Sequence, residues 1–253
     1  MDLPSVPDRP ENGNVILLLV ACVLVASSAI QSATGSGFGL IAGPALILIA
    51  PWLVPAPLLI LTIPMMLLVV TRERGHCDTR TVGIATITML PGIAVGLWFI
   101  QRVDTASVQL LVAILALAAG AAMLAGKSVT GSRRTLAGAG AAAGFMGALA
   151  AMPGPPLSLT YRPNNAAALR STLSTIFLVM AAATLVALQF QIGITGNELL
   201  TAAALSPLLV CGHLLGSQMA RRISLAVLSR TTTYIILAAA TVLFIKSAAG
   251  LAL

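Results

Sequence analysis

The most constraining feature of this chain is a run of 60 residues, 12–71, without one charged side chain. A single helix of that length would extend for about 90 Å, whereas the hydrocarbon layer of a bilayer is about 30 Å thick. The run must therefore fold back at least once. Of the 253 residues 58% are hydrophobic and 8% are charged, which leaves too few polar groups to cover a soluble domain. The sequence predicts an all-α, polytopic membrane protein.

Two interruptions divide the uncharged run: a glycine-rich stretch at 34–39 and a proline-rich stretch at 51–57. Glycine frees the backbone from the helix and proline removes a hydrogen-bond donor, so both favour breaks. Charged or proline-rich stretches separate the later apolar segments in the same way. Ten membrane elements are expected, some too short to span comfortably, at residues 14–31, 37–50, 56–71, 81–100, 107–126, 135–151, 154–163, 170–190, 198–219 and 227–251.

Basic residues orient these elements, because loops rich in Lys and Arg stay on the cytoplasmic side. The loops at 72–80, 127–134 and 221–222 are basic and are expected in the cytoplasm. The loops at 101–106 and 191–197 and the acidic N-terminus are expected outside. Because the start of the chain is acidic, unlike a secretory leader, we expect the first apolar segment to be retained. The net charge of +7 then reflects membrane orientation, and no nucleic-acid partner is expected.

The chain also resembles a duplication. Pro91 with Gly96 recurs as Pro207 with Gly212, and the order of basic and non-basic loops around the two pairs is reversed. We therefore expect two inverted repeats of about five elements, the first two of each being short or broken. The expected parts are an external tail at 1–13, a first transmembrane repeat at 14–126, a cytoplasmic linker at 127–134 and a second repeat at 135–253. Inverted repeats with broken helices are typical of secondary transporters, whose sites lie where the repeats meet.

The first break carries candidate binding groups. Backbone N–H groups freed at membrane depth must be buried in protein or line a cavity, where they suit an anion. The alternative is that these small residues only allow close helix packing. The candidate residues at this break are Gln31, Thr34, Gly35, Ser36, Gly37, Gly39 and Pro44.

The second break follows residue 147, where three prolines within four residues end a helix. Arg170 begins the next long apolar segment, either as an interfacial anchor or as a cationic ligand for an anionic substrate. Hydroxyl groups beside it offer further donors to the same oxyanion. The candidate residues in this region are Gly154, Pro155, Tyr161, Arg170, Ser171 and Thr172.

His213 is the ionisable side chain that lies well inside an apolar segment. It is either a proton-coupling group or a neutral histidine that is hydrogen-bonded to a neighbouring carbonyl, and the second reading is favoured. A catalytic function has little support, because the chain lacks HExxH, GxSxG and Walker motifs and carries no acidic residue within a span. Cys22, Cys77 and Cys211 are too scattered for a redox or metal site.

Residues 35–44 resemble the glycine-rich, proline-ended motif of the TauE/SafE sulfite exporter family. Residues 154–161 and the later Arg170-Ser171-Thr172-Leu173 are similar to a second signature of that family, with Leu169 in place of its usual aromatic residue. The resemblance covers nearly the whole chain. It implies transport of a small anion, commonly sulfite or an organosulfonate, and it strengthens the ligand role of Arg170.

The sequence thus predicts a multi-pass transporter of the bacterial inner membrane that moves a small sulfur-containing or carboxylate anion by alternating access. No bound cofactor or metal is expected, and the expected partners are the anion and the lipid bilayer, with a homodimer left open. The alternative is a non-transporting membrane assembly or insertion factor whose small residues serve packing.

Overall fold

The computed structural model describes residues 13–126 and 132–251, and within them it contains α-helices, one short 3-10 helix and no strand. This confirms the predicted all-α class. The expected tail at 1–13 and linker at 127–134 lie largely outside the described residues. The elements are α1 (Gly13–Thr34), α2 (Phe38–Ile49), η1 (Pro51–Leu53), α3 (Ala56–Arg72), α4 (Thr79–Arg102), α5 (Thr105–Leu124), α6 (Arg133–Ala150), α7 (Gly154–Thr160), α8 (Ala166–Gln191), α9 (Gly196–Arg222) and α10 (Leu225–Leu251).

Polar N-cap residues extend several helices beyond their apolar segments. Asp78 accepts a hydrogen bond from the first turn of α4, and Asn165 does the same for α8. The two helices therefore begin at 79 and 166, whereas the apolar pattern alone indicated 81 and 170. A capped polar turn satisfies the first N–H groups in the interfacial region, so the helix need not end where the hydrophobic side chains end.

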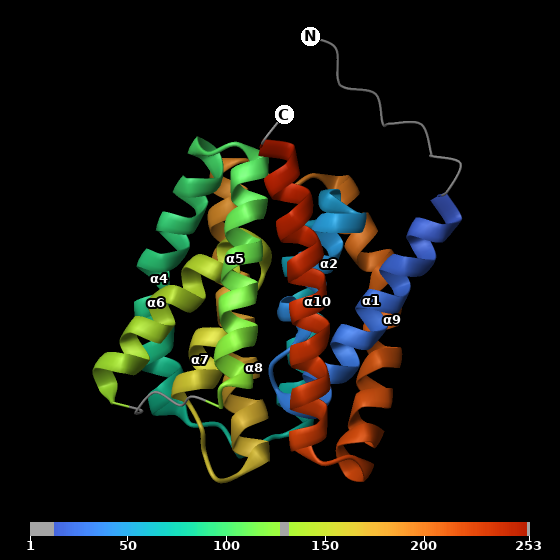
Figure 1. Cartoon of the computed structure of the whole chain (residues 1–253). Helices are drawn as coiled ribbons and strands as arrows, with labels where there is room; N and C mark the ends of the chain where they lie inside the picture. The colour runs from blue at the N-terminus through green and yellow to red at the C-terminus, as the bar shows by residue number, and fades with distance from the viewer. Residues whose placement is uncertain (1–12, 127–131, 252–253) are drawn as a thin grey trace.

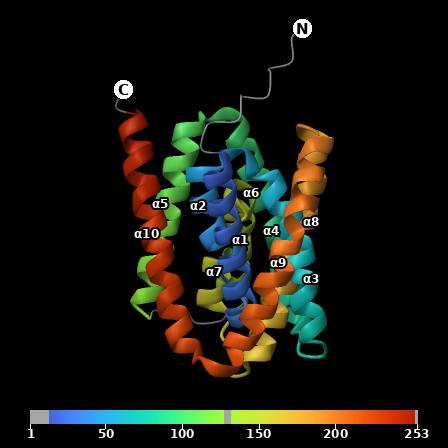
Figure 2. The same cartoon turned by 90° about the vertical axis from the view of Figure 1, so that its right-hand side faces the viewer.

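The helices form three layers (Figure 2). The pair α5 and α10 makes one outer layer, and α3, α4, α8 and α9 make the other. The interrupted pairs, α1 with α2 and α6 with α7, lie between them. Residues 27–33 at the end of α1 and most of α2 are buried. Irregular backbone is therefore covered by protein, as membrane depth requires.

The two halves of the chain begin at opposite ends of the molecule. In Figure 1, α1 starts at the upper end and runs down, whereas α6 starts at the lower end and runs up. The loops at 72–80 and 221–222 lie at the lower end, and those at 101–106 and 191–197 lie at the upper end. This grouping agrees with the sidedness that the basic residues predict.

The contacts between helices also correspond between the two halves of the chain. The helix pairs in most extensive contact are α1 with α9, α6 with α4, α3 with α8 and α5 with α10, a set that is unchanged when the halves are exchanged. A side chain at Gly96 would press on Ala148 of α6, and one at Gly212 would press on Ser28 of α1. The recurring proline-glycine pair thus marks equivalent close contacts with the first helix of the other half. These contacts support the inverted repeat, which stays a prediction.

The outer surface suits hydrocarbon. Among the described residues six helices are long and apolar enough to cross a membrane, namely α1, α4, α5, α8, α9 and α10. Large apolar side chains on them face outward, such as Ile87 at 71% exposure and Leu200 at 70%. Exposed apolar surface on this scale indicates contact with lipid, and the molecule is a multi-pass membrane protein.

We predict that a cysteine in place of His76 reacts from the cytoplasmic side, whereas cysteines in place of Thr105 and Asn197 react from outside. All three positions are exposed. His76 belongs to the loop between α3 and α4, at the lower end of Figure 1, and the other two belong to the first turns of α5 and α9, which begin at the upper end. The measurement is labelling of intact cells with an impermeant thiol reagent, in a variant without the three native cysteines. Labelling of positions 105 and 197 from opposite sides would rule out the inverted arrangement.

Candidate functional site

The two helix breaks touch each other through their backbones. A side-chain carbon built at Gly39, in the first turn of α2, would overlap the carbonyl oxygen of Ala151, which follows α6. One built at Gly43 would lie 2.7 Å from the carbonyl oxygen of Ala150. The breaks predicted from residues 34–39 and 147–156 therefore come together, as expected for a site between two repeats.

Gln31 closes the first break from inside. Its side chain is almost fully buried, at 1% exposure. The amide nitrogen donates to the carbonyl of Gly35 at 2.9 Å, and the amide oxygen accepts from the N–H of Phe38 at 3.1 Å. One side chain thus satisfies a carbonyl at the end of α1 and an N–H at the start of α2. Such groups are costly to leave unpaired away from water.

Thr34 and Gly35 shape the turn between the two helices. The Thr34 hydroxyl donates to the carbonyls of Ile30 and Ser36, both at 2.8 Å, and accepts from the Ser36 N–H at 3.3 Å. Gly35 has a φ of 85° and lies against Arg170, whose Cα would be 2.8 Å from a carbon added at Gly35. Both the left-handed backbone and this close approach require glycine.

The second break has a different chemistry. Ala151 closes α6 with a φ of 54°, the one positive φ of a non-glycine residue among those described. The short α7 follows directly, and Pro155 and Pro156 occupy its first turn. Prolines have no N–H, so this break offers fewer backbone donors than the first one. Gly154 borders the first break near Leu40, while Pro155 is buried in α7.

A small cavity lies where the breaks meet. Four predicted site residues line it, Gln31, Gly37, Gly39 and Gly154, together with Thr62, Met66 and Phe177. Its volume is about 10 Å³, which is the space of about one water molecule. Sulfite or a sulfonate is larger than that. The structure is therefore closed around this point.

Arg170 lies beside this turn, and its side chain forms an ion pair. Its Nε donates to Oε1 of Glu73 at 2.8 Å, and its side chain is 15% exposed. Arg72 donates to the same oxygen from Nε at 3.1 Å and from Nη2 at 2.9 Å. We call Arg72, Glu73 and Arg170 the arginine cluster. It joins the end of α3 to the start of α8.

The charge of Glu73 is stabilised by its partners. Burial raises the pKa of its carboxyl, but the hydrogen bonds and the positive charges of Arg170 and Arg72 together lower it more, so the net shift is downward. Hydrogen bonds and positive charges favour the ionised form of a carboxyl group. Glu73 is thus a carboxylate at neutral pH.

Four other predicted residues do not line the small cavity. The Thr172 hydroxyl accepts from the Asp78 N–H at 2.9 Å and lies 3.1 Å from the Tyr161 hydroxyl, so it links α8 to the start of α4 and the end of α7. Ser171 is buried in α8. Pro44 lies inside α2 and does not line the cavity.

His213 is connected to the arginine cluster through Ser32. Its Nδ1 lies 2.7 Å from the Ser32 hydroxyl, and the Ser32 carbonyl accepts from Arg72 Nη2 at 2.7 Å. His213 is a buried, hydrogen-bonded histidine, but its partner is a hydroxyl and not the neighbouring carbonyl expected from the sequence. The contact fastens α9 to the end of α1.

Arg72 and Glu73 are functional candidates that sequence reasoning missed. Both stand in the loop that was interpreted only as a topology signal. The sequence does offer a signal, because Glu73 stands between arginines at the end of an apolar segment. A charged residue in such a place usually pairs with a residue of opposite charge.

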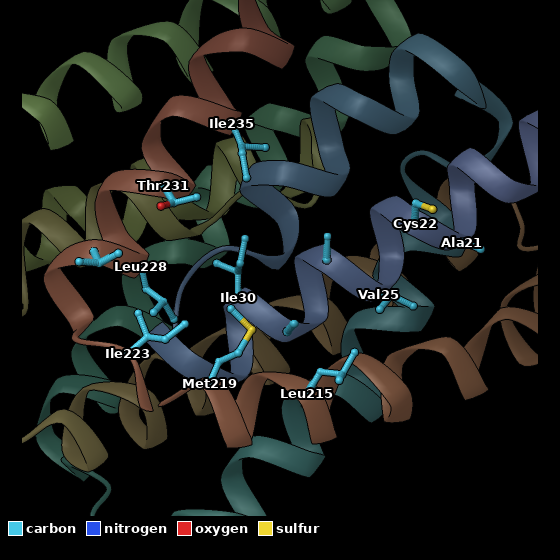
Figure 3. A pocket seen from close by; sticks show the side chains of 13 residues that line it. Ala21, Cys22, Val25, Ile30, Leu215, Met219, Ile223, Leu228, Thr231 and Ile235 are labelled. Atoms are coloured by element: carbon cyan, nitrogen blue, oxygen red, sulfur yellow. The ribbon is translucent and has the colours of Figure 1, made fainter. Parts of the chain in front are cut away.

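A much larger groove lies elsewhere, between α1, α9 and α10 (Figure 3). Its volume is about 730 Å³, and it is lined by apolar side chains such as Val25, Leu215 and Ile235. No charged residue lines it. A small anion would gain no compensation there for its lost hydration, so the arginine cluster and the two breaks are the candidate site.

We predict that Gly39→Ala separates the two breaks and lowers thermal stability strongly, because the added carbon overlaps a backbone oxygen that cannot move alone. Gly138→Ala is the matched control, since nothing lies within 4 Å of a carbon added there, and it should be neutral or stabilising by up to about 1 kcal/mol. Melting of the two purified variants in detergent gives the comparison. Equal melting temperatures would mean that the breaks do not depend on this contact.

Comparison with known proteins identifies the family of the chain. The profile of the sulfite exporter TauE/SafE family matches residues 19–243, which covers both breaks and the arginine cluster. No curated protein and no solved structure shows a significant match. Since the match extends over nearly the whole chain, the protein belongs to the TauE/SafE family of membrane sulfite exporters.

Proposed function

We propose that this protein transports a small oxyanion, sulfite or an organosulfonate, across the bacterial inner membrane by alternating access. The anion binds beside the meeting point of the two breaks. Arg170 supplies positive charge, and the first turn of α2 supplies backbone N–H groups. Family membership supports an anion exporter-type transporter; the substrate, the site and the mechanism are our proposal.

The observation that carries the proposal is the environment of Arg170. An interfacial anchor extends its guanidinium into water, whereas this side chain is largely buried and already holds a carboxylate oxygen. It lies against Gly35 of the first break. A planar guanidinium suits the oxygens of a carboxylate, a sulfite or a sulfonate through paired hydrogen bonds. The position is thus suited to oxyanion binding.

The first turn of α2 supports the same site. Gly39 and Leu40 border the small cavity. Their N–H groups belong to the first turn of a helix and have no acceptor inside it. Together with the positive end of the helix dipole they favour an anion. Because the cavity holds about one water, binding requires the two breaks to move apart, which is a step that alternating access provides.

We predict that Arg170→Ala weakens sulfite binding by about 2 kcal/mol or more, the range for removing one partner of a buried charge pair. Arg170→Lys should weaken it by less, because an ammonium keeps the charge but loses the planar pair of donors. Arg162→Ala is the control, since Arg162 is an exposed arginine in the loop that leads to α8. Calorimetric titration of the purified proteins measures the dissociation constants. Unchanged binding by Arg170→Ala would remove Arg170 from the site.

Thermal melting of the same purified protein distinguishes an anion transporter from an assembly factor. A bound anion raises the melting temperature by stabilising the folded state, whereas a packing scaffold gains nothing from it. Sulfite, thiosulfate, methanesulfonate and acetate form the screen, with chloride at equal ionic strength as the reference. Stabilisation by none of them would favour the assembly factor.

For His213→Asn we predict near-normal sulfite transport with an unchanged pH profile, because asparagine can keep the hydrogen bond to Ser32 but cannot titrate. His76→Asn, in an exposed loop, controls for the loss of a histidine. Uptake into proteoliposomes is measured with and without a pH gradient. Loss of gradient-driven uptake with intact sulfite binding would assign proton coupling to His213.

A further inference from the structure

Glu73 holds more guanidinium hydrogen bonds than one carboxylate oxygen normally needs. Three N–H groups from Arg72 and Arg170 converge on its Oε1 at 2.8–3.1 Å. The side chain of Glu73 is 12% exposed. Charge-assisted hydrogen bonds of this kind are among the stronger ones in proteins. The carboxylate therefore occupies the centre of the arginine cluster in the closed structure.

The cluster still has capacity for an anion. Two guanidinium groups against one carboxylate leave one positive charge unbalanced. Nη1 of Arg72 is buried and has no hydrogen-bond partner among the described residues. Buried donors without a partner are rare in folded proteins because each costs free energy. The cluster is thus incomplete with Glu73 alone.

We propose that Glu73 is a tethered competitor for the anion site: its carboxylate occupies Arg72 and Arg170 in the closed state, and an incoming sulfite or sulfonate displaces it. This inference rests on the proposed function. It adds Arg72 to the anion ligands, with Nη1 as the donor that the substrate would satisfy.

The position of Glu73 allows the exchange. Glu73 directly follows α3, which ends at Arg72, and its own backbone is no longer helical. Its side chain can therefore leave the arginines without unwinding the helix. Arg170, by contrast, lies in the first turns of α8 and is backed by Gly35. The carboxylate can withdraw while Arg170 stays in place.

The charges around Glu73 determine how the exchange depends on pH. From its own loop these are Arg72, Arg74, His76 and Asp78; α8 adds Arg170; and α9 adds His213 through Ser32. The arginines keep the pKa of Glu73 below its usual value in the anion-free state. Once an anion displaces it, the carboxylate loses these partners and its pKa returns toward the usual value, so binding is accompanied by proton uptake at acidic pH only.

The first test compares Glu73→Gln with the wild type at pH 7.5, using calorimetric titration with sulfite and with methanesulfonate. Glutamine keeps the shape but not the charge, so competition weakens and both anions should bind about tenfold more tightly. This factor corresponds to an anion site that Glu73 leaves free about a tenth of the time in the wild type. Asp78→Asn is the matched control. It removes one negative charge from the same loop and keeps a residue that can cap α4. Its affinity should equal that of the wild type.

The outcomes separate this inference from the proposed function. If the wild type binds an anion and Glu73→Gln binds it equally or less tightly, Glu73 is no competitor, and the proposed function stands. An equal gain in Asp78→Asn would reduce the effect to general electrostatics and overturn the competition. If neither the wild type nor Glu73→Gln binds either anion, both proposals fail. Binding by Glu73→Gln alone supports the competition.

A second measurement uses the unmodified protein. Methanesulfonate stays ionised throughout, so its affinity reports on the protein. Wild-type affinity should be constant above about pH 6. It should rise as the pH falls from the usual pKa of a glutamate, about 4.3, toward the lowered pKa of Glu73, because protonated Glu73 releases the arginines. Glu73→Gln should show no rise in this window. A rise of equal size in the variant would assign the pH effect to other groups.

Discussion

A helix can be interrupted inside a bilayer only where protein covers the backbone groups that the interruption exposes, and the rest of this structure depends on how that is done. Gln31 bridges the end of α1 and the start of α2 from within. The outer side of the same break is closed by Ala151 of the other half, which lies directly on Gly39. Neither half is therefore complete without the other. The two outer layers hold the interrupted pairs in this contact.

The first break also brings unlike electrostatic ends together. The carbonyl end of α1 is negative and the N–H end of α2 is positive. Arg72 binds the carbonyl of Ser32 near the end of α1 and so compensates its negative end. The start of α2 keeps its positive character next to the cavity. The break thus becomes a locally positive point in a membrane interior where isolated charges are expensive.

Much of the fold was predictable because membrane sequences carry strong signals. A charge within hydrocarbon is costly, so charged and proline-rich stretches mark the ends of segments, and ten expected elements correspond to the ten described α-helices. The glycines of the first break were predictable too, since Gly35 and Gly39 serve a left-handed turn and a backbone contact. Bounds set by caps, as at Asn165, were not visible in hydropathy alone.

The arginine cluster was harder to predict for a physical reason. Arg170 and Glu73 are 97 positions apart, and they meet because α3 packs on α8. No local pattern encodes that pairing. Arg170 could be recognised as a candidate ligand, but its carboxylate partner could be found only from the three-dimensional structure. The hydroxyls of Tyr161 and Thr172 are a similar case, since the sequence marked both as candidate ligands but did not show that they contact each other.

The arginine cluster lies at one end of the crossing between α3 and α8, and the opposite end has no equivalent. Residues 50–60 and 186–197, where α3 begins and α8 ends, carry no charged side chain. Parting the helices at the lower end must break charge-assisted hydrogen bonds, whereas parting them at the upper end separates uncharged surfaces. The two ends of the contact between α3 and α8 are therefore chemically unequal. Low pH, which protonates Glu73, and high ionic strength weaken the contact of α3 with α8 at the lower end, and both leave the uncharged contact of the same helices at the upper end unchanged.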